Sequence, residues 1–360
     1  MDHKNTYIII MAGGIGSRFW PMSRTTFPKQ FHDILNRGKS LIQETMDRYT
    51  SFVPVENIYV VTNARYFDLV KEQLPALKDD QILLEPVGRN TAPCIAYASY
   101  KINKINPEAV FVVAPADHMI EREEVFQEKI IMGLKACSEQ EMIMTLGITP
   151  TRPDTGYGYI QYLEDQEENG YYRVKTFTEK PNLEVAQSFL ESGDYVWNGG
   201  IFLFSATTIL SAFASHLPDM AELFSGMAEA YYSSEEASEI ARVYGICKNI
   251  SIDYGIMEKA SNVHVIPGDF GWSDLGTWGS VHTNSEKDYL ENTAHGKVIV
   301  YESFNNVIQS TNPEKLIVLK GLEGFIVVDT GDALLICKKE EEQFIKEIVG
   351  DLKLTQSAYV

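Results

Sequence analysis

The chain opens with an apolar run that breaks into a glycine turn, and this stretch restricts the possible fold more strongly than any other. Residues 7–11 read YIIIM, and the next five are Ala12, Gly13, Gly14, Ile15 and Gly16. Glycine is needed where the backbone takes positive φ or approaches a ligand closely, and the N–H groups of such a turn can point at phosphate oxygens. Five basic residues and one acid lie between residues 13 and 39, a charge of +4 in a chain whose net charge is −19. The pattern predicts a strand, a phosphate-binding turn and cations.

Spacing excludes two better-known glycine loops. A P-loop needs glycine, four residues and then Gly-Lys-Ser or Gly-Lys-Thr, and the sequence contains no such string. A dinucleotide fingerprint needs G-x-G-x-x-G, but Gly14-x-Gly16-x-x is followed by Phe19. The predicted phosphate-binding turn is therefore of another type. The alternative is an ordinary glycine turn whose neighbouring charges have no role in binding.

Apolar strands alternate with helices after the glycine turn. Strands are predicted at 58–62, 82–84, 109–114 and 142–148, and helices at 40–53, 65–74, 91–105 and 121–137. Strands that are apolar throughout indicate a parallel sheet covered on both faces, with ligands outside the carboxyl ends of the strands. We therefore expect a Rossmann-like, doubly wound α/β fold.

The pattern changes after residue 150 and again after residue 290. Strands at 157–162, 174–178 and 201–204 and a helix at 183–191 predict an insertion with antiparallel strands at about 151–265, which makes the sheet mixed. Residues 218–243 are acidic and predict exposed helices. Short β segments and a closing helix at 340–352 predict a small β-rich C-terminal domain, residues 291–360, similar to a short β-helix, after a large domain of residues 1–290.

Composition and charge exclude several classes of protein. The apolar fraction of 44% is ordinary for a globular protein, and an acidic chain lacks the basic face that a nucleic-acid-binding protein needs. The four cysteines lie far apart, as is typical of reduced core thiols. The residues MDHKNTY are polar and do not resemble the apolar segment of a signal peptide, and the most apolar stretch, 201–214, is shorter than the roughly 20 residues of a membrane span. We expect a cytoplasmic protein without nucleic-acid or membrane partners.

Glu85 follows the predicted strand 82–84 and begins the loop EPVGRNTAP. A carboxylate accepts two parallel hydrogen bonds, and the Watson–Crick edge of guanine offers N1–H beside an amino group, a pair that adenine and uracil do not present. Glu85 is therefore a candidate for guanine recognition, and a solvated loop glutamate is the alternative.

Two aspartates are candidate metal ligands. Asp117 follows the buried strand 109–114, and Asp274 lies among glycines and aromatic residues in GWSDLGTW. Mg²⁺ is usually held by one or two carboxylates together with substrate phosphates, so this pair would suffice for Mg²⁺ or another divalent cation. In the alternative interpretation, Asp117 caps a helix that begins near Glu121.

Glu179 and Lys180 end the predicted strand 174–178. If the strand continues, the two side chains alternate, and one could face sugar hydroxyls while the other faces a phosphate. Charged residues that end a strand are usually solvated, which is the alternative for this pair.

Taken together, these motifs resemble the sugar nucleotidylyltransferase family over nearly all of the chain. The strings that carry the resemblance are GGIGSR with PK nine residues later, EPVGRNTAP, EKP, WNGG and SIDYGIMEK. They are similar to those of the mannose-1-phosphate guanylyltransferase branch. The sequence departs from the usual pattern of that branch at Phe19, Met22, Cys94, Gly199 and Gly255.

The resemblance implies roles for individual residues. Catalytic roles fall on Arg18, Lys29 and Lys180, and magnesium binding falls on Asp117 and Asp274. Nucleotide binding falls on Met11, Ala12, Gly13, Gly14, Gly16, Glu85, Gly88, Arg89, Asn90 and Thr91. Binding of the sugar phosphate falls on Tyr157, Gly158, Glu179, Lys180, Asn198, Gly200 and Asp253.

The activity that the resemblance implies is transfer of GMP from GTP to mannose 1-phosphate, which yields GDP-mannose and pyrophosphate with Mg²⁺ as cofactor. The attacking phosphate oxygen is already anionic, so neither a general base nor a covalent intermediate is required, and the sequence shows no Ser/His/Asp or Cys/His constellation. A nucleotidylyltransferase for another sugar 1-phosphate and a catalytically silent regulatory homologue are the alternatives. The C-terminal domain is expected to brace the fold or to form the contact of a homodimer.

Overall fold

The computed structural model describes residues 3–360 and divides the chain into two compact units, each built from several stretches. The first unit comprises the chain up to Gly13 together with Met46–Ala116 and Ile120–Trp272, and the second comprises Gly14–Thr45, Asp117–Met119 and Ser273–Val360. Helix α1 (Leu41–Thr50) and the short strands β5 (Met119–Ile120) and β11 (Trp272–Ser273) lie where the chain passes from one unit to the other.

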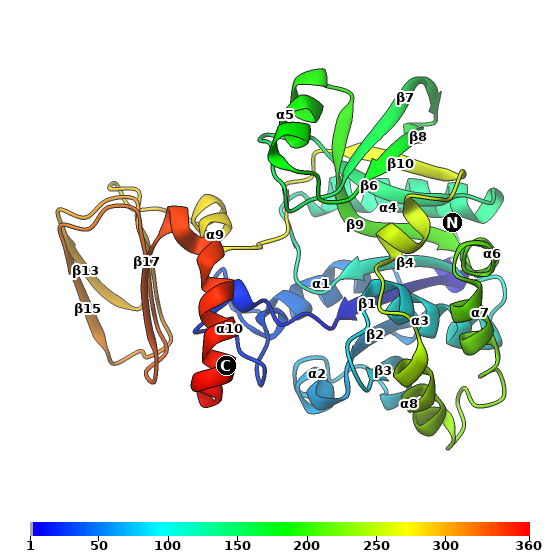
Figure 1. The fold of residues 1–360 in the computed structure, drawn as a ribbon, viewed down its shortest axis with the longest axis horizontal. Helices are drawn as coiled ribbons and strands as arrows, with labels where there is room; N and C mark the ends of the chain where they lie inside the picture. The colour runs from blue at the N-terminus through cyan, green and yellow to red at the C-terminus, as the bar shows by residue number, and fades with distance from the viewer. Residues whose placement is uncertain (1–2) are drawn as a thin grey trace. The chain divides into compact units, whose positions relative to one another are not determined.

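A mixed sheet forms the frame of the first unit (Figure 1), with the strand order β3-β2-β1-β4-β9-β6-β10-β8-β7. Its strands are β1 (Thr6–Ala12), β2 (Ile58–Asn63), β3 (Ile82–Glu85), β4 (Val110–Pro115), β6 (Ile143–Ile148), β7 (Tyr159–Glu168), β8 (Tyr171–Thr178), β9 (Tyr195–Ser205) and β10 (Val263–Gly268). β1 to β4 pair in parallel, as do β6 and β10. β9 runs antiparallel to β4 and β6, and β8 runs antiparallel to β7 and β10. The doubly wound mixed sheet predicted from the sequence is confirmed.

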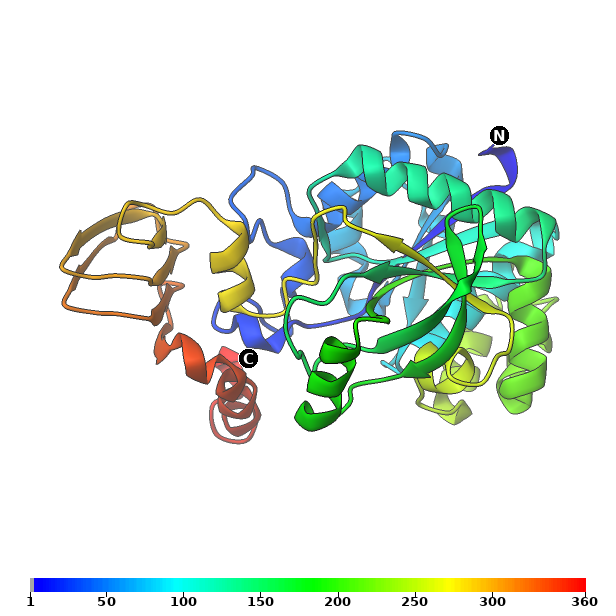
Figure 2. The same ribbon diagram turned by 90° about the horizontal axis from the view of Figure 1, so that it is seen from above.

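Helices cover both faces of this sheet (Figure 2). They are α2 (Phe67–Gln73), α3 (Thr91–Ile105), α4 (Glu123–Glu139), α5 (Leu183–Ser192), α6 (Ala206–His216), α7 (Pro218–Ser225) and α8 (Glu236–Ile246). Successive side chains of a strand point to opposite faces. Phe202 and Phe204 of β9 join the core cluster that contains α3 and α6, whereas Leu203 lies against Gly133 of α4. Burial on both faces explains why these strands are apolar throughout.

The sequence predicts a strand that begins at residue 201, but in the structure β9 begins at Tyr195 and includes the WNGG motif. Trp197 and Asn198 are paired with Ile148 and Gly147 of β6. A register shift in this pairing, together with a φ of 66° at Gly200, lets the strand bend without ending. The predicted start of this strand was therefore wrong, because cross-strand pairing is not visible in the local sequence.

The acidic helices and the SIDYGIMEK motif also differ from expectation. α7 and α8 were expected to be exposed, but each buries one face, with Phe224 and Tyr244 completely buried. The SIDYGIMEK segment forms a π-helical turn, Asp253–Met257, and the hydroxyl of Ser251 just before it accepts the N–H of Tyr254 at 3.3 Å. Turns of this type are rare and often occur at functional sites.

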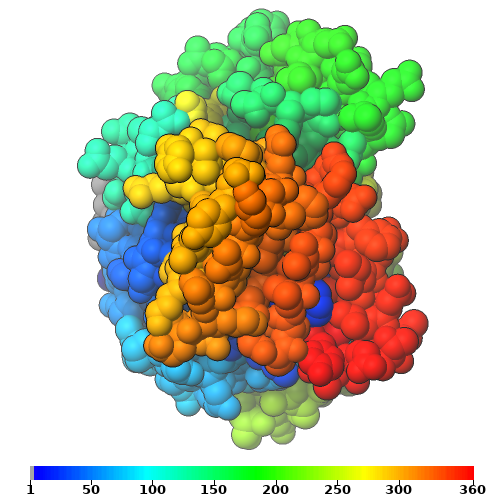
Figure 3. All heavy atoms as spheres, turned by 90° about the vertical axis from the view of Figure 1, so that its left-hand side faces the viewer, coloured from blue at the N-terminus to red at the C-terminus, as the bar shows by residue number. Residues whose placement is uncertain are grey.

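A small β structure makes up most of the second unit. Its strands are β12 (Thr293–His295), β13 (Lys297–Tyr301), β14 (Val307–Ser310), β15 (Leu316–Lys320), β16 (Phe325–Asp329) and β17 (Leu334–Lys338). One sheet has the order β12-β14-β16-β17, and β13 pairs in parallel with β15. The pairings are parallel except for that of β16 with β17, as expected for a short β-helix. In the space-filling view of Figure 3 these strands (orange) lie beside helix α10 (Ile345–Thr355, red).

The segment after the glycine turn folds onto this C-terminal structure. Phe19 and Trp20 belong to a core cluster with Val328 and Val349, and the ring of Phe19 lies 5.0 Å from that of Trp278, at the start of helix α9 (Trp278–Asn284). Residues 14–45 are thus packed with the end of the chain, far away in sequence.

Among residues 3–360, no helix is both long enough and apolar enough to cross a lipid bilayer.

Candidate functional site

Lys29 is the centre of the candidate site in the second unit. Its ammonium donates to Oδ2 of Asp117 at 2.9 Å and to the backbone carbonyl of Asp274 at 2.7 Å. The side chain of Lys29 is 4% exposed, and its Nζ lies 5.5 Å from the centre of the Phe19 ring. Burial would raise the pKa of Asp117, but the charges of Lys29 and His118 and the hydrogen bond from Lys29 outweigh it, so the pKa is lowered. Asp117 is therefore held in its ionised form.

The glycine turn places Lys29. The N–H of Lys29 donates to the carbonyl of Ile15 at 3.1 Å, and Ser23 also donates its hydroxyl to that carbonyl. Gly16 has a φ of 73°, and a Cβ at this position would overlap the side chain of Lys29. Only glycine allows the turn and the lysine to approach so closely.

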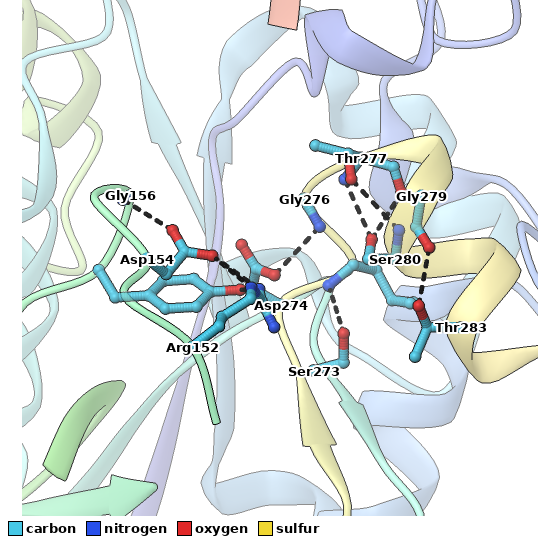
Figure 4. Close-up of polar contacts among 12 residues, drawn as sticks. Arg152, Asp154, Gly156, Ser273, Asp274, Gly276, Thr277, Gly279, Ser280 and Thr283 are labelled. Atoms are coloured by element: carbon cyan, nitrogen blue, oxygen red, sulfur yellow. Dashed lines mark hydrogen bonds and ion pairs between the residues drawn. The ribbon is translucent and has the colours of Figure 1, made fainter. Parts of the chain in front are cut away.

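The loop that carries Asp274 is held by its own hydrogen bonds (Figure 4). Oδ1 of Asp274 accepts the N–H of Gly276 at 3.1 Å, and Ser273 accepts the N–H of Leu275 at 3.2 Å. Leu275 is buried and has a φ of 44°, an uncommon conformation for a bulky residue. Strained backbone of this kind persists where the surroundings determine it, and here it fixes the direction of the neighbouring aspartate.

The two aspartates fit a hard divalent cation. Carboxylate oxygens are the ligands that Mg²⁺ prefers, and it takes one or two of them together with substrate phosphates. Within residues 3–360, no group of three or more His, Cys, Asp or Glu side chains is placed to hold a metal. The alternative role of Asp117 as a helix cap is wrong, because α4 begins at Glu123 with Arg122 as its N-cap residue.

Arg18 does not join the cluster around Lys29 in this structure. Its Nε donates to Oε1 of Gln343 at 2.7 Å, which ties it to the segment before α10. Arg24 likewise forms a two-pronged ion pair with Asp332, with both distances at 2.7 Å. Of the cations that follow the glycine turn, Lys29 is the one that the structure brings to the two aspartates among the described contacts.

Glu85 lies in the first unit at the end of β3 and is 5% exposed. The hydroxyl of Tyr244, on α8, donates to its Oε1 at 2.9 Å. Burial, partly offset by this hydrogen bond, raises the pKa of Glu85 to about 7. The alternative of a solvated loop glutamate is therefore wrong.

The rest of the predicted nucleotide-binding loop is held by hydrogen bonds to neighbouring segments of the first unit. Asn90 has a φ of 70° and caps α3 by accepting the N–H of Thr91. Thr91 accepts the N–H of Ile252 at 2.9 Å, and Arg89 donates to the carbonyl of Tyr244 at 2.9 Å. Gly88 is exposed.

The end of β1 is also held by hydrogen bonds. The carbonyl of Met11 accepts the N–H of Ala116, and the carbonyl of Ala12 accepts the hydroxyl of Thr62. The glycine turn follows, with Gly13 as the last residue of this stretch of the first unit and Gly14 as the first residue of the second unit.

A second group of polar side chains in the first unit gathers around Asn198. Its Nδ2 donates to Asp253 at 2.9 Å, and its Oδ1 accepts from the hydroxyl of Thr145 at 2.9 Å and from the N–H of Gly200 at 3.1 Å. Burial and the nearby charge of Glu179 raise the pKa of Asp253 to about 6. Amide and carboxyl groups fixed in this way can donate to and accept from hydroxyl groups.

Glu179 and Lys180 differ in exposure. The side chain of Glu179 is 6% exposed and that of Lys180 is 57% exposed, and the two form an ion pair. A Cβ on Gly158 would lie 2.5 Å from Oε2 of Glu179, so glycine is needed for this approach. Lys180 has a φ of 47°, and its N–H donates to the carbonyl of Tyr157 at 3.2 Å. The alternative of a solvated pair is wrong for Glu179, whereas the side chain of Lys180 extends into solvent.

Three residues that hold the predicted ones were not identified from the sequence. Tyr244 binds Glu85, Thr145 binds Asn198, and Glu258 accepts the N–H of Glu179 at 3.2 Å. Thr145 lies in an apolar strand and Tyr244 in an acidic helix, and neither belongs to a motif. Only Glu258 lay within a recognised string, SIDYGIMEK.

Two family models match most of the chain. Residues 7–291 match the Nucleotidyl transferase family, and residues 296–352 match the MannoseP isomerase/GMP-like beta-helix domain. The larger match includes all residues predicted for the site.

Named relatives and a solved structure agree with these matches. The chain is 37% identical over 348 residues to the alginate biosynthesis protein AlgA of Pseudomonas aeruginosa, covering 96% of this chain and 71% of that protein. It is 37% identical over 359 residues to mannose-1-phosphate guanylyltransferase 2 of Escherichia coli O157:H7, covering 97% and 73%. A crystal structure called a mannose-1-phosphate geranyltransferase, from Thermus thermophilus, is 33% identical with a TM-score of 0.86, covering 97% of this chain and 99% of that one.

Proposed function

Because this chain belongs to the mannose-1-phosphate guanylyltransferases within the nucleotidyl transferase family, we propose that it transfers GMP from GTP to mannose 1-phosphate, releasing pyrophosphate. The protein is a nucleotidyltransferase, and its named relatives support a role on sugar phosphates. The observation that carries the finer proposal is the Lys29 cluster, in which one buried ammonium donates to the carboxylate of Asp117 and to the backbone carbonyl of Asp274.

The reaction requires that the two substrates be positioned for attack and that the negative charge developing on pyrophosphate be stabilised. The attacking oxygen of the sugar phosphate is already anionic, so an in-line displacement at the α-phosphorus needs no general base and no covalent intermediate. The protein must hold two anionic substrates together and stabilise the departing pyrophosphate.

Residues of the second unit would act on the triphosphate. The backbone N–H groups of Gly14 and Gly16, following Gly13, would bind phosphate oxygens, and Lys29 would stabilise the charge that develops on pyrophosphate. Arg18 would join it after exchanging its bond to Gln343 for one to phosphate. Asp117 and Asp274 would hold Mg²⁺, which supplies charge neutralisation at the reacting phosphates.

Residues of the first unit would select the base and the sugar. The ionised carboxylate of Glu85 would accept the N1–H and the amino group of guanine. Asn198, Asp253 and Glu179 would bind sugar hydroxyls, with Tyr157, Gly158 and Gly200 shaping their surroundings, and the exposed Lys180 would bind the sugar phosphate. The loop Gly88, Arg89, Asn90 and Thr91 and the end of β1, Met11 and Ala12, would line the nucleotide.

The test is pyrophosphate release by the purified protein with Mg²⁺. GTP, ATP, UTP, CTP and dTTP are crossed with the 1-phosphates of mannose, glucose and fucose. Release with GTP and mannose 1-phosphate alone is the expected result. Release with GTP and a different sugar would overturn the assignment of the Asn198 group to mannose, and no release by protein that binds GDP-mannose would favour a regulatory homologue.

The homodimer expected from the sequence stays a prediction. Sedimentation or light scattering of the same sample would measure its mass.

A further inference from the structure

A single hydroxyl from a distant helix contacts the carboxylate assigned to guanine. Tyr244 lies 159 residues after Glu85 and donates to Oε1 at 2.9 Å. The other oxygen, Oε2, faces the glycine turn, since a Cβ on Gly13 would lie 3.2 Å from it. The carboxylate is therefore held from one side by a hydroxyl while its second oxygen is directed to the turn.

We propose that Tyr244 is a positioning residue, which fixes the orientation of the Glu85 carboxylate and thereby sets both the selectivity for guanine and the pH dependence of GTP binding. This inference rests on the proposed function, in which Glu85 reads the base. Tyr244 itself does not touch the nucleotide in this account. It acts through the carboxylate.

Tyr244 is rigid enough for this role. Its side chain is completely buried, and its ring packs edge-on against Phe224 with the ring centres 6.1 Å apart. Ile240 and Val243 of the same helix are buried beside it, and Arg89 donates to the backbone carbonyl of Tyr244 at 2.9 Å. A hydroxyl on such a ring has few positions open to it, so it selects one orientation of its partner.

The charge of Glu85 depends on a small set of neighbours. The titratable groups that face it are the hydroxyl of Tyr244 on α8, the thiol of Cys94 on α3 and the thiol of Cys247 after α8, and burial raises the pKa of all three. Arg89, the nearby cation, lies close to Cys247 and donates its hydrogen bonds to backbone carbonyls. The stabilising partner of the ionised carboxylate is therefore a neutral donor.

The sign of the pH effect follows from the hydrogen bonds. Only the ionised carboxylate accepts from both N1–H and the amino group of guanine, so GTP affinity falls as the pH drops through the pKa of Glu85, about 7. The bond from Tyr244 lowers this pKa. Removing the hydroxyl should raise it, and the loss of GTP affinity should then begin at a higher pH.

The experiment compares the wild type with Tyr244→Phe between about pH 6 and pH 8.5, a range that spans the titration of Glu85. The KM values for GTP and for inosine triphosphate, which lacks the amino group, are measured by pyrophosphate release at each pH. We expect the midpoint of the GTP profile to move to higher pH, the KM for GTP at neutral pH to rise about tenfold, and the preference for GTP over inosine triphosphate to shrink. The kcat should change little.

Tyr231→Phe is the matched control. Its hydroxyl is also buried and donates at 2.8 Å, but to the backbone carbonyl of Phe224. This variant should keep the wild-type profile and the wild-type preference. A second test, should Tyr244→Phe fold poorly, is Glu85→Gln, whose KM for GTP should no longer vary near pH 7.

The outcomes distinguish a failure of the inference about Tyr244 from a failure of the proposed function. If the wild type uses GTP but Tyr244→Phe leaves both midpoint and preference unchanged, the inference about Tyr244 is wrong and the proposed function stands. A pH-independent KM in the wild type, or a Glu85→Gln variant that keeps the pH dependence, would also overturn it. If the wild type releases no pyrophosphate from GTP, the proposed function itself fails.

Discussion

Glu85 and Asp117 are both placed by a buried parallel strand, yet their surroundings favour opposite charge states. Glu85 ends β3, its partner is the neutral hydroxyl of Tyr244, and burial raises its pKa to about 7. Asp117 follows β4, its partner is the ammonium of Lys29, and its pKa is lowered. The end of a strand thus supplies a position, while the neighbour that packs there decides the charge.

The difference suits the two different tasks that we propose for these carboxylates. A carboxylate that receives hydrogen bonds from an uncharged base can tolerate a raised pKa, because the base itself favours the ionised form when it binds. If Asp117 holds a divalent cation, its lowered pKa means that no proton has to be displaced when the cation binds. Five changes test whether this contrast, and the division of roles around it, holds.

Replacing Lys29 should have the largest effect. Lys29→Met keeps the volume and removes the charge that stabilises Asp117 and would stabilise pyrophosphate, so kcat should fall roughly 10²- to 10³-fold. It is measured as pyrophosphate release at saturating substrates. Lys71→Met is the control. Lys71 forms an ion pair with Asp79, and the side chains are 33% and 75% exposed, so the loss of this pair should leave kcat unchanged. Near-normal turnover of a folded Lys29→Met protein would contradict the assigned role.

Glu85→Gln should damage binding while improving stability. One charge-assisted hydrogen-bond partner of guanine is lost, so the KM for GTP should rise about 10- to 100-fold with kcat nearly unchanged. The pKa of Glu85 is raised from 4.5 to about 7, so the folded state holds more protons in this window and its stability falls as the pH rises through it. Glutamine removes that cost, and above pH 7 the free energy of unfolding should increase by about 1–3 kcal/mol.

Asp117→Asn sharpens the contrast, because the same chemical change should act in the opposite direction. It leaves the buried ammonium of Lys29 without its charged partner and should lower the free energy of unfolding by about 1–3 kcal/mol. Both variants are compared by urea denaturation at pH 8. Equal signs for the two would show that the charge environments do not differ as described.

Gly158→Ala should have a smaller, selective effect. The added methyl group would meet Oε2 of Glu179 at 2.5 Å and Cβ of Asn198 at 3.3 Å, and it would therefore displace a carboxylate that we propose to bind the sugar. The KM for mannose 1-phosphate should rise roughly tenfold and that for GTP should not change. Gly350→Ala is the control for the substitution itself, because a Cβ at this position in α10 meets no atom within 4 Å. An effect on GTP alone would contradict the division of roles.

Arg24→Gln should have the smallest effect. Arg24 and Asp332 are 16% and 54% exposed, and an ion pair of that exposure contributes less than about 1 kcal/mol to stability. The variant should keep its kcat, in contrast to Lys29→Met, although both cations follow the same glycine turn. A large loss of turnover would mean that the C-terminal strands hold the turn in its working form.

Much of the fold could be predicted because its signals are local. The ends of β1, β2, β3, β4 and β6 lie within one residue of the predicted ones, since an apolar run bounded by helix signals marks a buried strand wherever it occurs. The same holds for the short β segments beyond residue 290. β10 was missed because VHVIPG is short and contains Pro267 and Gly268, two residue types that are depleted in strands.

The site divides in the same way. The sequence by itself determined which residues stand in the glycine turn, in the EPVGRNTAP loop and beside the strand ends, because those motifs are strings of neighbours. Only the tertiary structure decided that Lys29 rather than Arg18 meets Asp117, that WNGG lies within β9, and that Tyr244 binds Glu85. Hydrogen-bond partners, burial and the pKa values that follow from them depend on residues that are far apart in the chain and close in space.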